Sequence, residues 1–151
     1  MLPRFFEAQY GSRHPLVVEA RKSIQDERIF SAFLESVLDR LEILYASPLD
    51  YREKLRARET VFSDALKEFQ HLKVKLQTDR FLAFGSQELN NAYLMVIGLY
   101  HRHFNLFETV LRENGGDIKK TLLFLKNLAR SDGDILKKMQ NWVQEKGARV
   151  S

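Results

Sequence analysis

The sequence lacks cysteine, a signal-peptide pattern in its first residues and a long apolar run, and each absence argues against a class of protein. Without cysteine, the chain forms no disulfide bond and offers no thiolate to a metal ion, which suits a reducing compartment. Residues 1–7 contain no apolar stretch of the kind found in signal peptides. The longest uncharged apolar run, Ala92–Tyr100, is far shorter than the roughly 18 residues that would indicate a membrane span. We therefore expect a cytoplasmic protein without a membrane span, unless a segment upstream of this chain directs it elsewhere.

The composition is that of an ordinary folded domain with a mild basic excess. Hydrophobic residues make up 44% and charged residues 29% of the 151 positions, enough for one domain with a real core. The net charge of +4 is spread over expected helix surfaces, and aromatic residues do not alternate with basic ones as on nucleic-acid-binding surfaces. Nucleic acid is therefore not the expected partner, although the basic segment 51–80 keeps salt-sensitive binding open as a weaker alternative.

Hydrophobic periodicity in the first half predicts two long helices. Apolar residues at 3–4 spacing mark one face of the first: Phe30, Phe33, Leu34, Val37, Leu38, Leu41, Leu44 and Tyr45. This helix is expected from about Leu16 to about Ala46, because the residue before Pro48 disfavours the helical conformation. Asp50 and Glu53 form a capping-box pattern for a second helix that ends near residues 78–79. The short break between the two makes them an antiparallel hairpin.

The second half predicts shorter helices around one apolar segment. Ala92–Tyr100 has no polar face, so we expect a central helix buried on all sides, or one whose outer side covers a partner domain. Ser86, Asn90 or Asn91 is the expected cap of this helix. Caps of the later helices are expected at Asp117 and at Ser131 or Asp132.

Together these patterns predict an all-α fold, with a long antiparallel helical hairpin followed by a small bundle of shorter helices around a buried central helix. We expect a single domain over residues 1–151. Residues 1–80 hold the N-terminal segment and the hairpin, residues 81–146 the short-helix bundle, and residues 147–151 a tail.

No catalytic motif is complete within the chain. The sequence contains no His-Glu-x-x-His, no cysteine and no Gly-x-Ser-x-Gly. His101 and His103 suggest a metal pair, but residues two apart on a helix point to different faces. We therefore expect no metal site formed by this chain.

One polar cluster borders the apolar segment and supplies the candidate site residues. Its members are Asn90, Asn91, Tyr93, Tyr100, His101 and His103. Tyr93 and Tyr100 are seven residues apart and share a helix face. Such side chains either satisfy backbone groups beside the helix, or line a cleft and donate hydrogen bonds to an oxyanion or a peptide backbone.

Several short segments resemble the C-terminal part of a bacterial family of putative zinc aminopeptidases. The matching pieces are Phe5-Phe6 with Tyr10-Gly11-Ser12, Asp26-Glu27-Arg28 with Phe30 and Phe33, Leu41 with Leu44-Tyr45-Ala46-Ser47, Leu89-Asn90-Asn91-Ala92-Tyr93-Leu94 with Tyr100, and Gly115-Gly116-Asp117. They span nearly the whole chain. None is a catalytic fingerprint, and the Asn-Asn-Ala and Leu-Tyr-Ala-Ser segments are the most specific.

The resemblance implies a zinc-dependent peptidase whose metal motif lies upstream of the point that matches residue 1. Two histidines and a carboxylate would bind zinc there, and no zinc ligand carries over to this chain. Tyr100 becomes a candidate catalytic residue, and Asn90, Asn91, Tyr93, His101 and His103 become candidate substrate-binding residues. The implied partner is the upstream metal-binding domain or a peptide substrate. The alternative is a stand-alone helical module that binds another protein and has no enzymatic activity.

Overall fold

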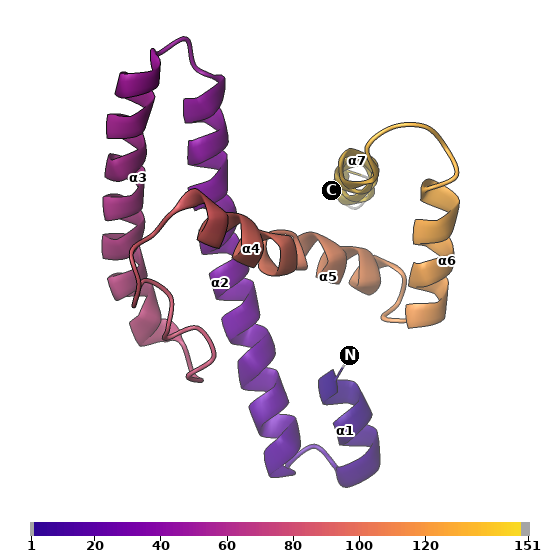
Figure 1. Ribbon diagram of the computed structural model, residues 1–151. Helices are drawn as coiled ribbons and strands as arrows, with labels where there is room; N and C mark the ends of the chain where they lie inside the picture. The colour runs from indigo at the N-terminus through magenta and orange to yellow at the C-terminus, as the bar shows by residue number, and fades with distance from the viewer. Residues whose placement is uncertain (1, 149–151) are drawn as a thin grey trace. The chain divides into compact units, whose positions relative to one another are not determined.

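The computed structural model describes residues 2–148, and within this range every regular element is helical. The elements are α1 (Leu2–Tyr10), α2 (Pro15–Ala46), α3 (Tyr51–Leu72), the 3₁₀ turn η1 (Lys73–Lys75), α4 (Asn91–His101), α5 (Phe104–Glu113), α6 (Ile118–Leu128) and α7 (Ile135–Ala148), shown in Figure 1. The predicted all-α fold is confirmed. The chain divides into two compact units, Met1–His103 and Phe104–Ser151, which are described separately. No helix among the described residues has the length and apolar character needed to cross a bilayer.

The predicted hairpin is present as α2 and α3, which run antiparallel in Figure 1. Pro15 occupies the first turn of α2, where its missing N–H costs nothing. The capping box of α3 is complete, because the Asp50 carboxylate accepts from the Glu53 N–H at 2.8 Å and the Glu53 carboxylate accepts from the Asp50 N–H at 3.0 Å. The expected end of this helix was too late, since α3 stops at Leu72 and η1 leads into a loop.

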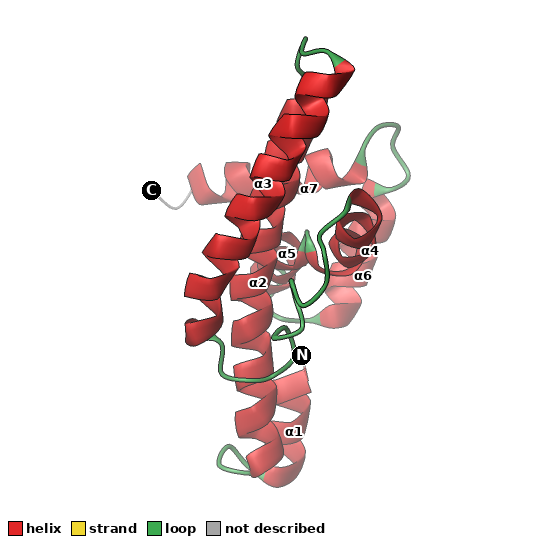
Figure 2. Cartoon of the chain, turned by 60° about the vertical axis from the view of Figure 1, so that its left-hand side comes forward, coloured by secondary structure: helices red, strands yellow, loops and turns green. Residues whose placement is uncertain are grey.

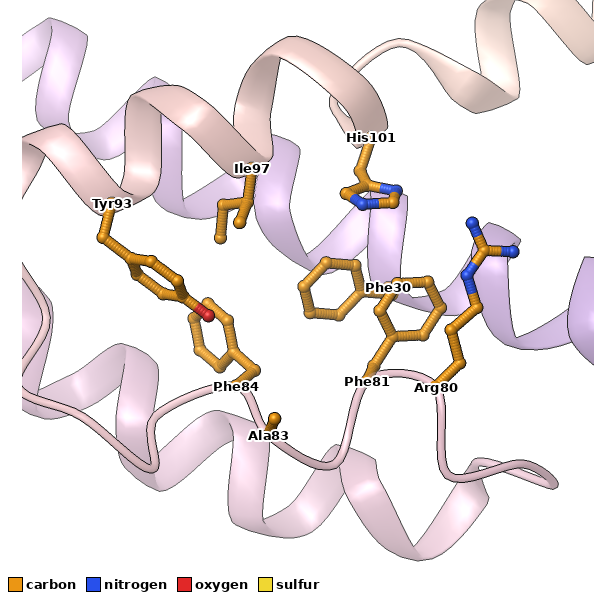
Figure 3. Close-up of a pocket in the computed structure, with 8 residues that line it drawn as sticks. All are labelled: Phe30, Arg80, Phe81, Ala83, Phe84, Tyr93, Ile97 and His101. Atoms are coloured by element: carbon orange, nitrogen blue, oxygen red, sulfur yellow. The ribbon is translucent and has the colours of Figure 1, made fainter.

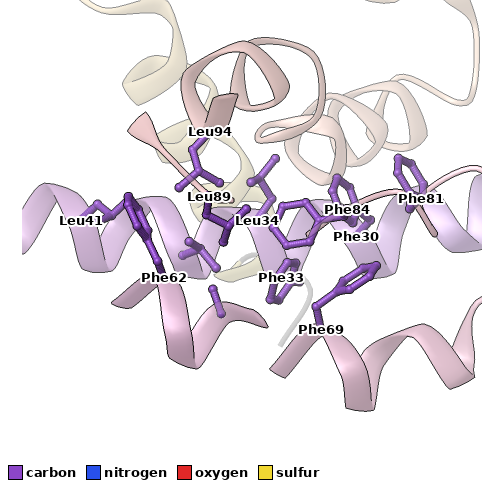
Figure 4. Packing of buried hydrophobic residues seen from close by; sticks show 12 residues of the cluster. Phe30, Phe33, Leu34, Leu41, Phe62, Phe69, Phe81, Phe84, Leu89 and Leu94 are labelled. Atoms are coloured by element: carbon purple, nitrogen blue, oxygen red, sulfur yellow. The ribbon is translucent and has the colours of Figure 1, made fainter. Parts of the chain in front are cut away.

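The core of the first unit is rich in aromatic side chains (Figure 4). Its rings come from both hairpin helices and from the loop that follows η1: Phe30, Phe33, Phe62, Phe69, Phe81 and Phe84. Phe30 and Phe81 stack with ring centroids 4.2 Å apart. Burying each such side chain stabilises the fold by about 1.5–3 kcal/mol, so Phe81 and Phe84 help to attach the loop to the hairpin.

Helix α4 is not the buried central helix that its composition predicted. Leu94 is its buried residue, whereas Met95, Leu99 and Tyr100 are 73%, 80% and 74% exposed. The reason is that α4 packs one face onto α2. Gly98 allows this approach, since a Cβ at its position would lie 2.8 Å from the Leu38 Cδ1 atom. The side chains on the opposite face remain exposed.

The two ends of the chain add helices that the sequence patterns only partly predicted. At the N-terminus, α1 pairs with α2 through an Arg21–Glu7 ion pair at 3.0 Å, and this helix was not expected.

In the second unit, Asp117 caps α6 as predicted, while the cap of α7 is the Asp134 carboxylate rather than Ser131 or Asp132. Helix α7 reaches Ala148. The first two residues of the predicted tail are therefore helical, and residues 149–151 lie outside the described part.

Candidate functional site

A cavity of about 230 Å³ lies within the first unit, between α2, α4 and the loop that joins η1 to α4 (Figure 3). Its lining combines aromatic and apolar side chains with two nitrogen-bearing ones: Phe30, Arg80, Phe81, Ala83, Phe84, Tyr93, Ile97 and His101. Tyr93 and His101 belong to the cluster that the sequence singled out. In the cavity, these two predicted candidates therefore lie beside residues that are distant in the sequence, such as Phe30.

The buried carboxylate of Asp26 positions the loop that forms one wall of the cavity. Asp26 is 0% exposed. Its oxygens accept hydrogen bonds from the Gln77 N–H at 2.9 Å, the Thr78 N–H at 2.7 Å and the Thr78 hydroxyl at 2.7 Å. Backbone N–H groups that face a carboxylate make strong, charge-assisted bonds. These hydrogen bonds hold residues 77–78 against α2. The loop residues that line the cavity, Arg80, Phe81 and Phe84, follow directly in the sequence.

The neighbouring carboxylate, Glu27, joins α2, the loop and α4 at one end of the cavity. Its side chain is 5% exposed. One oxygen lies 2.9 Å from the Arg80 guanidinium, and the other lies 2.5 Å from Nδ1 of His101. A buried carboxylate is costly unless both oxygens are paired, and here both are. Because a carboxylate accepts hydrogen bonds, Nδ1 carries the hydrogen, and a neutral His101 ring then presents Nε2 as an acceptor.

The walls of the cavity are aromatic, and they hold the polar groups in fixed orientations. His101 meets the Phe30 and Phe81 rings edge to face, with centroids 5.7 and 5.3 Å apart. The Arg80 guanidinium lies over the Phe81 ring, 5.2 Å from its centroid. At the other end, burial raises the pKa of Tyr93 above 10.0, so its hydroxyl stays protonated at neutral pH and can donate a hydrogen bond.

The two asparagines of the predicted cluster are bonded within the fold. Asn90 is the N-cap of α4, since its side-chain oxygen accepts from the Tyr93 N–H at 2.9 Å. The Asn91 side-chain oxygen accepts from the Tyr45 hydroxyl at 2.9 Å. Both amides therefore position the start of α4 and do not line the cavity.

Tyr100 and His103 lie outside the cavity. The Tyr100 ring is on the exposed face of α4. Nδ1 of His103 lies 4.0 Å from a Glu35 oxygen and has no hydrogen-bond partner in the described structure. Between these residues, Arg102 binds Asp39 at 2.6 Å and both oxygens of Glu42, which fixes the end of α4 against α2.

Sequence reasoning missed Glu27 and Arg80 as site residues, and it did not predict that aromatic residues line a cavity. One signal was present, because Asp26 and Glu27 stand four and three residues before Phe30 and so continue the buried face of α2. Acidic residues at buried positions need partners, and they indicate a polar site inside the fold. No comparable signal marked Arg80, whose place depends on the path of the loop.

The described residues do not fit a zinc ion. Among residues 2–148, no group of three or more His, Asp or Glu side chains could hold a metal. Both Glu27 oxygens are occupied by nitrogen donors. His103 and Glu35, 4.0 Å apart, supply two potential ligands, fewer than the three protein ligands of a zinc site.

The fold and cavity define an all-helical protein with an aromatic, Arg- and His-lined site and no metal cage among its described residues. Comparison with known proteins specifies its family. A family model described as "Putative aminopeptidase" matches residues 2–139, and the chain belongs to that family, as the sequence resemblance indicated. The comparisons matched no curated protein and no solved structure.

Proposed function

We propose that this chain is the C-terminal helical domain of a zinc-dependent aminopeptidase and forms one wall of its substrate cleft. The observation that carries the proposal is the family match, which covers residues 2–139 of the 151. Because the described residues do not fit a metal, the zinc ligands and the general base would come from an upstream part of the same protein.

The outer face of α4 supports this assignment. Met95, Val96, Leu99 and Tyr100 lie on one side of the helix, and each is more than half exposed. Contiguous exposed apolar side chains of this kind mark a surface that another structure covers. We assign that role to the metal-bearing part, which would bring Tyr100 and His103 to the border of the cleft. Asn90, Asn91, Tyr93 and His101 would act from the start and the inner side of α4.

Peptidase assays on two proteins test the proposal. The isolated chain and the longer reading frame are each incubated with zinc and an aminoacyl-4-nitroanilide. We expect chelator-sensitive hydrolysis by the longer protein alone. Robust hydrolysis by the isolated 151 residues would overturn the proposal, as would an inactive longer protein that carries an intact His-Glu-x-x-His.

Tyr100→Phe in the longer protein tests the role of the Tyr100 hydroxyl. If this group donates to the developing oxyanion, kcat should fall about a hundredfold. The unfolding temperature should change little, because the substitution removes one hydroxyl group and keeps the ring of a side chain that is largely exposed in this chain. Tyr51→Phe is the matched control, since Tyr51 is also largely exposed. A normal kcat for Tyr100→Phe would remove the catalytic assignment.

The second candidate function is a stand-alone helical module that uses the same α4 face to bind another protein. The exposed apolar face favours it as well. DNA upstream of the chain separates the two: an in-frame His-Glu-x-x-His supports the peptidase, and a promoter directly before residue 1 supports the module.

A further inference from the structure

The cavity has the chemistry of a binding site for a small carboxylate. Its polar end consists of the Arg80 guanidinium and the His101 ring, both held by Glu27. A guanidinium has five N–H donors, and the ion pair with Glu27 uses one nitrogen. The Arg80 side chain is half exposed, so its remaining donors are accessible to a ligand. Planar guanidinium groups match carboxylates with two parallel hydrogen bonds.

The same arrangement disfavours a cationic ligand. Aromatic rings such as Phe30, Phe81 and Phe84 can surround an ammonium group, and Glu27 would supply the counter-charge. Both Glu27 oxygens are already paired, however, and Arg80 lies over the Phe81 ring, where an ammonium would otherwise sit. A second cation would therefore meet a positive charge and no free carboxylate.

The size of the cavity limits the ligand to about one residue. Drug-sized ligands occupy about 300–1,000 Å³, whereas this cavity measures about 230 Å³. Its middle is apolar, with Phe30, Phe84 and Ile97 around it, as Figure 3 shows. One aliphatic or aromatic side chain fits such a space, with its polar groups directed toward Arg80 and His101.

We propose that this cavity binds the C-terminal residue of a peptide, or an equivalent N-acylated amino acid, that has an apolar side chain. The carboxylate accepts hydrogen bonds from Arg80, the side chain lies among Phe30, Phe81, Phe84 and Ile97, and the backbone N–H donates to Nε2 of His101. This assignment goes beyond the proposed function, because it requires neither a metal nor hydrolysis.

Binding to the whole 151-residue chain is measured by two-dimensional NMR with three probes. N-acetyl-leucine carries the carboxylate and the N–H, N-acetyl-leucinamide lacks the carboxylate, and leucinamide offers an ammonium instead. We expect saturable shifts in the loop 80–84 and at His101 with N-acetyl-leucine, at a Kd on the order of 1 mM. The other two probes should bind about tenfold more weakly or not at all.

Two variants locate the site. Arg80→Gln should weaken N-acetyl-leucine binding about tenfold or more, whereas Arg130→Gln, an exposed arginine of the other unit, should leave it unchanged. Ala83→Leu places a larger side chain in the lining of the cavity and should abolish N-acetyl-leucine binding. Ala92→Leu, on the exposed side of α4, should leave binding unchanged.

Three results would overturn the assignment. They are equal binding of all three probes, shifts that survive both Arg80→Gln and Ala83→Leu, and no saturable shift with N-acetyl-leucine at any soluble concentration. None of these results depends on peptidase activity, so the assignment and the proposed function can fail separately.

Discussion

Asp26 and Glu27, adjacent on α2, link three segments that are distant in the sequence. Asp26 holds the backbone of residues 77–78, and Glu27 holds Arg80 and His101. Adjacent helix residues are separated by about 100° around the axis, so the two carboxylates reach different partners. Loss of either one leaves part-buried donors without an acceptor, which costs more than the loss of a surface ion pair.

Asp26→Asn should destabilise the first unit by about 2–3 kcal/mol. The amide NH₂ group cannot accept, so at least one of the hydrogen bonds from Gln77 and Thr78 is lost in a fully buried position. Urea unfolding followed by circular dichroism measures the change. Asp79→Asn, at an exposed position of the same loop, should change stability little, and an equal loss in both variants would contradict the argument.

The Arg102–Glu42 pair predicts a pH dependence of stability. The hydrogen bond from Arg102 lowers the pKa of Glu42 below 4.5. Because the folded-state pKa is the lower one, the pair stabilises the fold above about pH 4.5 and loses this contribution as the pH falls through the folded-state value. Glu42 is largely exposed, so the contribution is about 0.5 kcal/mol.

Glu42→Gln should therefore be less stable than the parent protein at pH 7, and the difference should shrink toward zero as the pH falls from 4.5 to 3. Unfolding curves at each pH measure it. Glu19→Gln, an exposed position on the same helix, serves as the control. If the stability difference between Glu42→Gln and the parent protein grows as the pH falls, the prediction is wrong.

At the scale of elements, the loop between η1 and α4 decides the shape of the cavity. Phe81 and Phe84 attach it to the core, and Gly85 turns it toward α4 with a φ of +75°. A Cβ at Gly85 would lie 2.5 Å from the Leu66 Cδ2 atom, so the loop also touches α3 at this point. The loop therefore packs against both helices of the hairpin, α2 and α3.

Gly85→Ala should cost more stability than Gly11→Ala. Both glycines have a positive φ, +75° and +84°, so both variants carry the conformational cost of about 1 kcal/mol. Only Gly85→Ala also collides with Leu66, since nothing lies within 4 Å of the corresponding point at Gly11. Thermal unfolding compares them, and equal losses would mean that Leu66 moves aside freely.

At the scale of the whole molecule, the absence of a metal cage among the described residues has a direct consequence. Zinc should bind the isolated chain far more weakly than it binds a structural zinc site, since fewer than three ligands converge anywhere in residues 2–148. Addition of a chelator should leave the unfolding temperature unchanged. Calorimetric titration with zinc tests this, and stoichiometric binding at nanomolar affinity would contradict it.

The sequence by itself determined the helical fold, the hairpin and several helix ends. These features depend on local physics: the 3–4 spacing of Phe30, Phe33 and Val37, the capping box of Asp50 and Glu53, and the cap at Asp117. The family resemblance was likewise carried by short segments, and Asp26-Glu27 was among them.

Only the tertiary structure decided the cavity and the exposure of α4. The contacts of Glu27 with Arg80 and His101 join positions 53 and 74 residues apart in the sequence. The spacing of apolar residues along the chain gives no information about contacts over such separations. The apolar composition of Ala92–Tyr100 indicated burial, but burial depends on how many neighbours surround a helix, and within the first unit α2 and one loop cover a single face. Side-chain type sets what a helix would gain from burial, whereas the packing of distant segments sets which faces are covered.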